Sequence, residues 1–210
     1  HAAHVREEID DAAGFGWHIA EAKFDWPTLI ANKNTELDRL EGIYNSMLDT
    51  AGVEILAGRG KLIDAHTVEV GERKVTAERV LIATGGWPFL PDLPGIELAI
   101  TSNEAFDLPQ LPKRIAIVGG GYIACEFACI FNGLGVDTIQ LYRSDMILRG
   151  FDMDIREICC DEMRKSGIDV RLNANAVKLE KTAAGIALTT TAGDVLEVDQ
   201  VLFATGRAPN

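Results

Sequence analysis

Apolar residues along the chain change their spacing near Gly52, and the change separates a helical region from a strand-rich one. From Pro27 to Leu48 they recur at three- and four-residue steps, which predicts a long helix that begins at the proline and stops before Gly52. A shorter acidic helix is predicted over residues 5–13. After Gly52 short apolar runs are separated by glycine and charged residues, and they predict strands at 53–56, 67–70, 73–75 and 79–83.

Residues 87–112 break this pattern because they contain five prolines. Proline fixes φ and has no N–H, so this stretch suits neither a helix nor a central strand. We interpret residues 87–112 as a crossover between two domains, which occupy residues 1–86 and 113–210.

The second domain alternates buried-type strands with helices. The pattern predicts strands at 115–118, 137–142, 169–172 and 201–204, helices at 122–134 and 153–165, and an antiparallel meander at 176–198. This order is typical of an α/β, Rossmann-like, three-layer domain. Two segments echo each other, Val80-Leu81-Ile82-Ala83-Thr84-Gly85 and Val201-Leu202-Phe203-Ala204-Thr205-Gly206. The repeat indicates that residues 1–86 belong to a second, related nucleotide-binding domain that is present only in part.

Composition limits the partners of the chain. A formal net charge of −12 argues against nucleic acid as a partner. No apolar run reaches the roughly 18 to 20 residues of a membrane span, and no secretory signal is visible. The four cysteines form no Cys-x-x-Cys pair, lack a neighbouring histidine, and suit small buried residues of a reducing compartment better than a metal site. We therefore expect a cytoplasmic protein without a bound metal.

The run from Gly119 to Ala124 carries the strongest chemical signal. Strand, Gly-x-Gly-x-x-Ala and helix form the dinucleotide-binding fingerprint in its required context. Gly119 permits the tight turn, Gly121 lets the backbone approach a pyrophosphate, and Ala124 allows close packing of helix and strand. The helix start offers free N–H groups and a partial positive charge to the phosphates. The alternative is a glycine-rich turn that binds no ligand.

The end of the next strand predicts which nicotinamide cofactor binds. NAD-binding proteins carry a carboxylate there for the ribose 2′-hydroxyl, whereas this chain has Tyr142, then Arg143 and Arg149. Two guanidiniums can hold a 2′-phosphate through forked, charge-assisted hydrogen bonds, which favours NADPH on the order of a hundredfold or more. The alternative is that both arginines are ordinary surface residues; nearby Asp145 could orient one of them.

These motifs, with Ala83-Thr84-Gly85-Gly86, Leu148-Arg149-Gly150-Phe151-Asp152 and Ala204-Thr205-Gly206-Arg207, resemble the flavin-dependent pyridine nucleotide-disulfide oxidoreductases, most of all the glutathione reductase branch. The resemblance covers essentially the whole chain. It implies NADPH and FAD as cofactors, glutathione disulfide as substrate and a homodimeric parent enzyme. On this basis residues 1–86 are a partial FAD-binding domain and residues 113–210 an NADPH-binding domain.

The resemblance also implies roles for single residues. Tyr122 corresponds to a tyrosine that covers the flavin, and Glu126 to a glutamate near flavin and nicotinamide; both are candidate catalytic residues. Further implied residues bind NADPH at the glycine loop (Gly119, Gly120, Gly121, Ile123), bind its 2′-phosphate (Arg143, Arg149), lie near nicotinamide and flavin (Gly206, Arg207), surround the FAD adenosine and pyrophosphate (Arg59, Gly60, Thr84, Gly85), or line the disulfide cleft (Ile43, Tyr44). An Ile-Tyr pair at helical spacing is equally compatible with a helix core.

Three parts of the family's machinery have no counterpart in residues 1–210: an FAD-binding Gly-x-Gly-x-x-Gly loop, a redox-active Cys-x-x-x-x-Cys pair and a carboxy-terminal His-Glu pair. Cys125 and Cys129 have the wrong spacing to replace the redox pair. We therefore expect an internal fragment of such a reductase that binds NADPH and does not turn over alone. The alternatives are a sister reductase with another substrate and a free-standing NADPH-binding module without catalysis.

Overall fold

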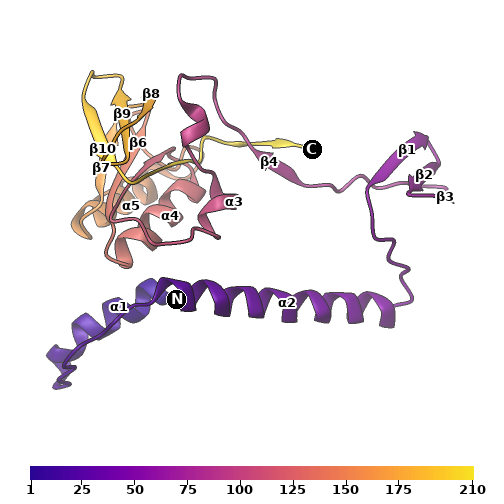
Figure 1. Cartoon of the computed structure of the whole chain (residues 1–210), viewed down its shortest axis with the longest axis horizontal. Coiled ribbons are helices and arrows are strands. Elements are labelled where there is room, and N and C mark those ends of the chain that lie inside the picture. Colours follow the sequence, from indigo (N-terminus) through magenta and orange to yellow (C-terminus); the bar gives the residue numbers. More distant parts are fainter. The chain divides into compact units, whose positions relative to one another are not determined.

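The computed structural model describes all 210 residues, which form two compact units (Figure 1). Unit 1 comprises His1–Pro27 and Gly86–Asn210, and unit 2 comprises Thr28–Gly85. Residues 1–27, which we assigned to the first domain together with residues 28–86, thus pack with the second half of the chain. No helix of the chain combines the length and the apolar character that a membrane span requires.

Unit 1 is built around a parallel sheet with the order β11-β5-β6-β7. Its strands are β5 (Arg114–Val118), β6 (Asp137–Tyr142), β7 (Asp169–Leu172) and β11 (Gln200–Phe203). The sheet is parallel throughout. β5 is apolar from Ile115 to Val118 because both faces of the sheet are covered, and β6 also buries Thr138 and Gln140. The predicted α/β fold class is confirmed.

The two faces of this sheet are covered by different layers. Ile115 and Ile117 of β5 belong to an apolar core shared with α4 (Tyr122–Gly133) and α5 (Met153–Lys165). Ala116 and Val118 point the other way, into a core shared with the meander of β8 (Ala176–Lys181), β9 (Ile186–Thr190) and β10 (Val195–Val198). Successive side chains of one strand thus enter two different cores, so the sheet lies between a layer of helices and the meander.

The proline-rich segment contributes short elements that border the sheet. These are β4 (Gly86–Pro88), η2 (Ile96–Leu98) and α3 (Ser102–Ala105). Ile100 pairs with Leu202, which places backbone beside the free edge of β11. β4 pairs with β12 (Arg207–Pro209) in an isolated two-stranded ladder. Three-residue strands that end in proline carry little pattern, so the sequence did not predict this pair.

Residues 1–27 pack on the helical side of unit 1. Helix α1 (Ala2–Asp11) lies against α4, and η1 (Ala12–Phe15) follows it (Figure 1). A Cβ at Gly133 would lie 2.6 Å from the Cβ of Ala3, so the two helices approach closely only because residue 133 is glycine. Further along, the indole Nε1 of Trp26 donates a hydrogen bond of 2.7 Å to the Leu108 carbonyl.

Unit 2 holds most of α2 (Trp26–Thr50) and a three-stranded antiparallel sheet. The strands β1 (Gly60–Asp64), β2 (Thr67–Val70) and β3 (Arg73–Thr76) lie in that order. The predictions for α2, β2 and β3 are confirmed, and Gly52 ends the helix with φ 72°. β1 was missed because its apolar core, Leu62 and Ile63, is flanked by charge.

Two predicted strands in unit 2 are wrong. Residues 53–56 and 79–83 form no strand, although both runs are apolar enough. A strand exists only if its backbone N–H and C=O groups find a partner strand, and neither run has one. Leu81 is 89% exposed as a result.

Candidate dinucleotide-binding site

The glycine loop lies where β5 meets α4, as predicted. Gly119 has φ 146°, and a Cβ there would collide with the carbonyl oxygen of Ala204 at the end of β11. Its N–H donates to the Leu141 carbonyl at 2.9 Å, so the loop is anchored to the neighbouring strand. Ala124 is fully buried beside Gly119, which agrees with the predicted close packing of helix and strand.

The next two glycines serve opposite purposes. A Cβ at Gly120 would overlap the ring of Tyr142, so this glycine makes room for the side chain at the end of β6. A Cβ at Gly121 would meet no atom within 4 Å. Gly121 therefore faces open space, and a ligand can approach its backbone from outside. The role of Gly120 toward Tyr142 is not visible in the sequence motif, because it depends on a strand that is 20 residues away.

Helix α4 begins without a side-chain cap. Gly121 is its N-cap residue, with φ −83°, and no acidic residue lies in the first turn. The first hydrogen bond of the helix runs from the Cys125 N–H to the Gly121 carbonyl at 3.1 Å. The N–H groups before Cys125 have no partner within the helix, and the helix dipole adds a partial positive charge at this end. Such a helix start is suited to bind an anion.

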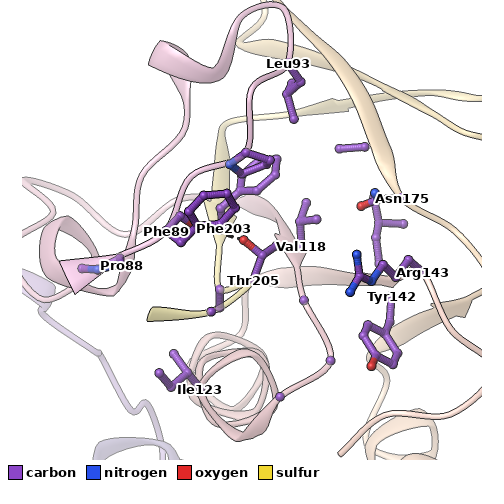
Figure 2. A pocket seen from close by; sticks show the side chains of 18 of the residues that line it. Pro88, Phe89, Leu93, Val118, Ile123, Tyr142, Arg143, Asn175, Phe203 and Thr205 are labelled. Carbon is purple, nitrogen blue, oxygen red and sulfur yellow. Dashed lines mark hydrogen bonds between the residues drawn. The ribbon is translucent and has the colours of Figure 1, made fainter. Parts of the chain in front are cut away.

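A cavity of about 830 Å³ opens in front of the glycine loop. Figure 2 shows Tyr142 and Arg143 on one side of it and Pro88, Phe89 and Ile123 on the other, with Val118 and Thr205 between. The Thr205 hydroxyl donates to the Phe89 carbonyl at 3.1 Å, which ties the β11 end to the proline-rich segment. All these residues belong to unit 1, so the cavity lies within one compact unit.

Both predicted arginines line this cavity. Arg143 follows β6 directly, and in Figure 2 its guanidinium lies beside Asn175. Arg149 comes from the loop before α5. Neither side chain forms an ion pair or a hydrogen bond with the protein, and Asp145 binds neither of them. The structure therefore places two unpaired cations in the lining of the same cavity.

Tyr122 and Ile123 form the cavity edge at the first turn of α4. The Tyr122 ring is 58% exposed and makes no hydrogen bond that would fix it, so the ring is free to move. Glu126 lies one turn further along α4 and does not line the cavity. It is exposed, so its charge carries no burial cost.

Gly206 and Arg207 also line the cavity. Arg207 pairs with Pro88 in the ladder of β12 and β4, and its guanidinium donates a hydrogen bond to the Gly86 carbonyl. Gly206 has φ 144°, a region that only glycine adopts easily, and its carbonyl accepts from the Phe89 N–H at 2.9 Å. Nine of the predicted site residues thus meet in one cavity: Gly119, Gly120, Gly121, Tyr122, Ile123, Arg143, Arg149, Gly206 and Arg207.

The remaining predicted site residues lie in unit 2, apart from Glu126 in unit 1. Ile43 and Tyr44 lie on α2, where Ile43 is 41% and Tyr44 62% exposed, so in this structure the pair is not part of a helix core. Arg59 and Gly60 lie at the start of β1, and Thr84 and Gly85 lie directly before β4. None of these four residues lines the cavity. Their predicted roles at the flavin therefore stay predictions.

The cysteines lie on α4 and α5, and all four are free. Burial raises the pKa of the Cys125 thiol to about 11, although the Gln140 amide donates a hydrogen bond to its sulfur. Burial also raises the pKa values of Cys129 and Cys160. Thiols with raised pKa values are poor nucleophiles at neutral pH, which agrees with the prediction that Cys125 and Cys129 do not replace a redox pair. No group of His, Cys, Asp and Glu side chains has the geometry of a metal site.

The whole chain, residues 1–210, matches the family described as pyridine nucleotide-disulphide oxidoreductase. The chain belongs to this family. Its glycine loop, cavity and parallel sheet are accordingly those of an oxidoreductase family that uses a pyridine nucleotide.

Several members of this oxidoreductase family resemble the whole chain. It is 49% identical over 210 residues to a glutathione reductase of Burkholderia cepacia, with 100% of this chain and 47% of that protein covered. It is 47% identical over 212 residues to the chloroplastic/mitochondrial glutathione reductase of Pisum sativum, with 38% of that protein covered. A trypanothione reductase of Trypanosoma congolense is 39% identical, with 99% of this chain and 45% of that protein covered.

The solved structures agree with these relatives. The HOCl-induced flavoprotein disulfide reductase RclA of Escherichia coli superimposes with a TM-score of 0.82 at 25% sequence identity, over 100% of this chain and 46% of that chain. The present chain spans about half the length of the relatives that it matches. The predicted membership of the flavoprotein disulfide reductases, with glutathione reductases as homologues, is confirmed.

Proposed function

We propose that this chain is the NADPH-binding part of an FAD-containing enzyme that reduces glutathione disulfide. One observation carries the proposal: two unpaired guanidiniums, Arg143 and Arg149, line the same cavity as an uncapped helix N-terminus. A dinucleotide with an extra 2′-phosphate has the charge that matches this arrangement. The glutathione reductase relatives at 44–49% identity support the choice of substrate.

In this proposal, different residues of the cavity bind different parts of NADPH. The N-terminus of α4 binds the pyrophosphate, and Gly121 leaves space for it. Arg143 and Arg149 recognise the 2′-phosphate and so exclude NADH. Bound NADPH supplies a hydride from its nicotinamide ring. We propose that Gly206 and Arg207, which also line the cavity, border the nicotinamide.

Tyr122 and Glu126 are the proposed catalytic residues. The Tyr122 ring lies at the cavity edge without a fixing hydrogen bond, so it can cover the reactive end of the cavity and move aside for the nicotinamide. Covering excludes water from the transfer. Glu126 lies one turn along the same helix and presents an exposed carboxylate on α4. We propose that it fixes charge near the flavin in the complete enzyme.

The substrate and the flavin involve residues of unit 2. We propose that Ile43 and Tyr44, exposed on α2, line the disulfide cleft, and that Arg59, Gly60, Thr84 and Gly85 contact FAD in the complete protein. These residues do not share a cavity in this chain, so we derive no step through the flavin. We also propose that the parent enzyme is a homodimer and that it acts in the cytoplasm.

Two alternatives retain specific support. A trypanothione reductase is also a relative, at 39% identity, which favours a sister enzyme that acts on another disulfide. In the complete enzyme, a Tyr44→Ala change that leaves the KM for glutathione disulfide unaltered would support that alternative. The cavity lies entirely within unit 1, which favours a binding module that works without the flavin half. A Cys-x-x-x-x-Cys pair upstream of His1 in the parent reading frame would support the enzyme instead.

Titration of the chain with NADPH and NADH tests the proposal. We expect a preference for NADPH of about a hundredfold, because two charge-assisted contacts to the phosphate are lost with NADH. Arg143→Ala and Arg149→Ala should each reduce this preference about tenfold and leave NADH binding unchanged. Lys165→Ala is a matched control, because this cation pairs only with Glu162 on the surface of α5. Equal affinity of the unmodified chain for both cofactors would overturn the proposal.

A further inference from the structure

The loop over residues 143–152 carries both proposed phosphate-binding arginines, yet it contains no helix or regular strand. Arg143 and Arg149 can converge on one phosphate only if this loop holds one shape. Recognition of the 2′-phosphate therefore depends on the contacts that fix the backbone of this loop as well as on the two guanidiniums.

One anchor of this loop is the glycine loop itself. The Leu148 N–H donates a hydrogen bond of 2.6 Å to the Gly120 carbonyl. Leu148 has φ 55°, a left-handed conformation that a leucine rarely adopts. The adjacent Ile147 side chain is fully buried. A strained backbone persists only where its surroundings enforce it, so a second anchor is required.

Arg156 supplies this second anchor from the first turns of α5. Its Nε donates to the Ile147 carbonyl at 2.7 Å, and its Nη2 donates to the Met146 carbonyl at 2.8 Å. The planar guanidinium thus clamps two consecutive carbonyls directly before Leu148. A lysine could not form this fork, because it presents donors from a single nitrogen.

The position of Arg156 is electrostatically unfavourable for its own helix. A cation near a helix N-terminus opposes the helix dipole, and no carboxylate forms an ion pair with Arg156. The two hydrogen bonds to the loop therefore account for a cation at this position. Arg156 does not line the cavity, so it does not contact a bound nucleotide directly.

We infer that Arg156 is a positioning residue that sets the preference for a 2′-phosphorylated dinucleotide by holding the Met146–Arg149 backbone. This inference rests on the proposed NADPH binding. It assigns specificity to a residue outside the cavity, through the backbone that places Arg149 and through the hydrogen bond from Leu148 to Gly120.

The test uses the full chain with Arg156→Gln and Arg156→Lys, titrated with NADPH and NADH. We expect R156Q to weaken NADPH binding about fivefold, which is less than the roughly tenfold loss expected when Arg143 or Arg149 itself is removed. NADH binding should change less than about twofold, because NADH lacks the 2′-phosphate that Arg143 and Arg149 bind. General damage to the fold would weaken both cofactors equally, so the ratio separates positioning from stability.

R156K separates the hydrogen-bonded fork from charge alone. We expect R156K to recover only part of the preference, since it keeps the charge and loses the fork. Arg164→Gln is the matched control: Arg164 lies on the same helix and donates to the Val170 carbonyl at 3.2 Å, away from the cavity. It should leave the NADPH-to-NADH ratio unchanged.

Hydrogen exchange gives a readout that does not depend on a ligand. We expect the Leu148 amide to exchange faster in R156Q, while amides of β5 keep their protection. If the unmodified chain prefers NADPH and Arg143→Ala reduces that preference, but R156Q leaves it unchanged, the inference is overturned and the proposed function stands. If the unmodified chain shows no preference, both fail. Full recovery by R156K would also overturn the inference, because charge alone would then suffice.

Discussion

The two echoing segments, residues 80–85 and 201–206, have nearly the same sequence pattern and different structures. Residues 200–203 form β11, which pairs in parallel with β5 on one side and meets Ile100 on the other. Leu202 is fully buried. In residues 80–85 no strand forms, and the corresponding Leu81 is 89% exposed.

The difference teaches that an apolar run specifies a strand only when neighbours are present to pair with it. In unit 1 the sheet offers β5 as a partner, and α4 and the meander cover both faces. In unit 2 the sheet consists of β1, β2 and β3, and residues 80–85 pair with none of them. The same pattern therefore has two outcomes, because backbone pairing and burial are properties of the surroundings.

Truncation of the corresponding leucines should show the largest contrast. We expect Leu202→Ala to lower the free energy of unfolding by about 2–5 kcal/mol, because it leaves a cavity in a closely packed core. Leu81→Ala should change it by less than about 0.5 kcal/mol, because the side chain contributes no burial. Urea unfolding followed by far-UV circular dichroism measures both. Equal effects would contradict the comparison.

The contact between β11 and the glycine loop should show the next largest effect. Gly119→Ala places a Cβ against the Ala204 carbonyl at a positive φ, so we expect a loss of about 2–3 kcal/mol. Gly121→Ala is the control in the same loop: its Cβ meets no atom and its φ is ordinary. This change should cost less than about 1 kcal/mol of stability and still weaken NADPH binding. Thermal unfolding and titration, performed on both variants, separate the two roles.

The smallest expected effect concerns the segment that borders β11. The Thr101 side chain and N–H hold the pKa of Glu104 below its usual value in the capping box of α3. A lowered pKa in the folded state stabilises the fold above the unfolded pKa of about 4.3 and loses this contribution as pH falls through the folded value. The carboxylate is exposed and screened, so we expect less than about 1 kcal/mol.

Glu104→Gln keeps the capping geometry and cannot ionise. The difference in unfolding free energy between the unmodified chain and E104Q should therefore shrink as the pH is lowered from 7 through 4. A difference that stays constant over this range would show that ionisation of Glu104 does not contribute.

Much of unit 1 was predictable because its signals are local. The strand at 115–118, the glycine loop and the helix at 153–165 each follow from consecutive residues. The ladder of β4 and β12 was not predicted, because it joins residues about 120 positions apart through short segments that end in proline. Arg156 was missed for a related reason. It binds backbone carbonyls, which every residue has, so the sequence does not indicate its partners.

The candidate site divides in the same way. The fingerprint and the arginine pair were predicted from the sequence, and the structure brings them into one cavity. The proposed flavin and disulfide residues lie in unit 2, where the cavity does not reach. Their roles at the flavin and the disulfide substrate therefore stay predictions.

Binding of adenosine 2′,5′-bisphosphate and adenosine 5′-monophosphate tests the central claim most directly, because these probes differ only in the 2′-phosphate. We expect the chain to bind the bisphosphate at least about thirtyfold more tightly at low salt, and a chain with both Arg143→Ala and Arg149→Ala to bind the two probes equally. Equal binding by the unmodified chain, or a preference that survives both changes, would contradict recognition of the phosphate by this arginine pair.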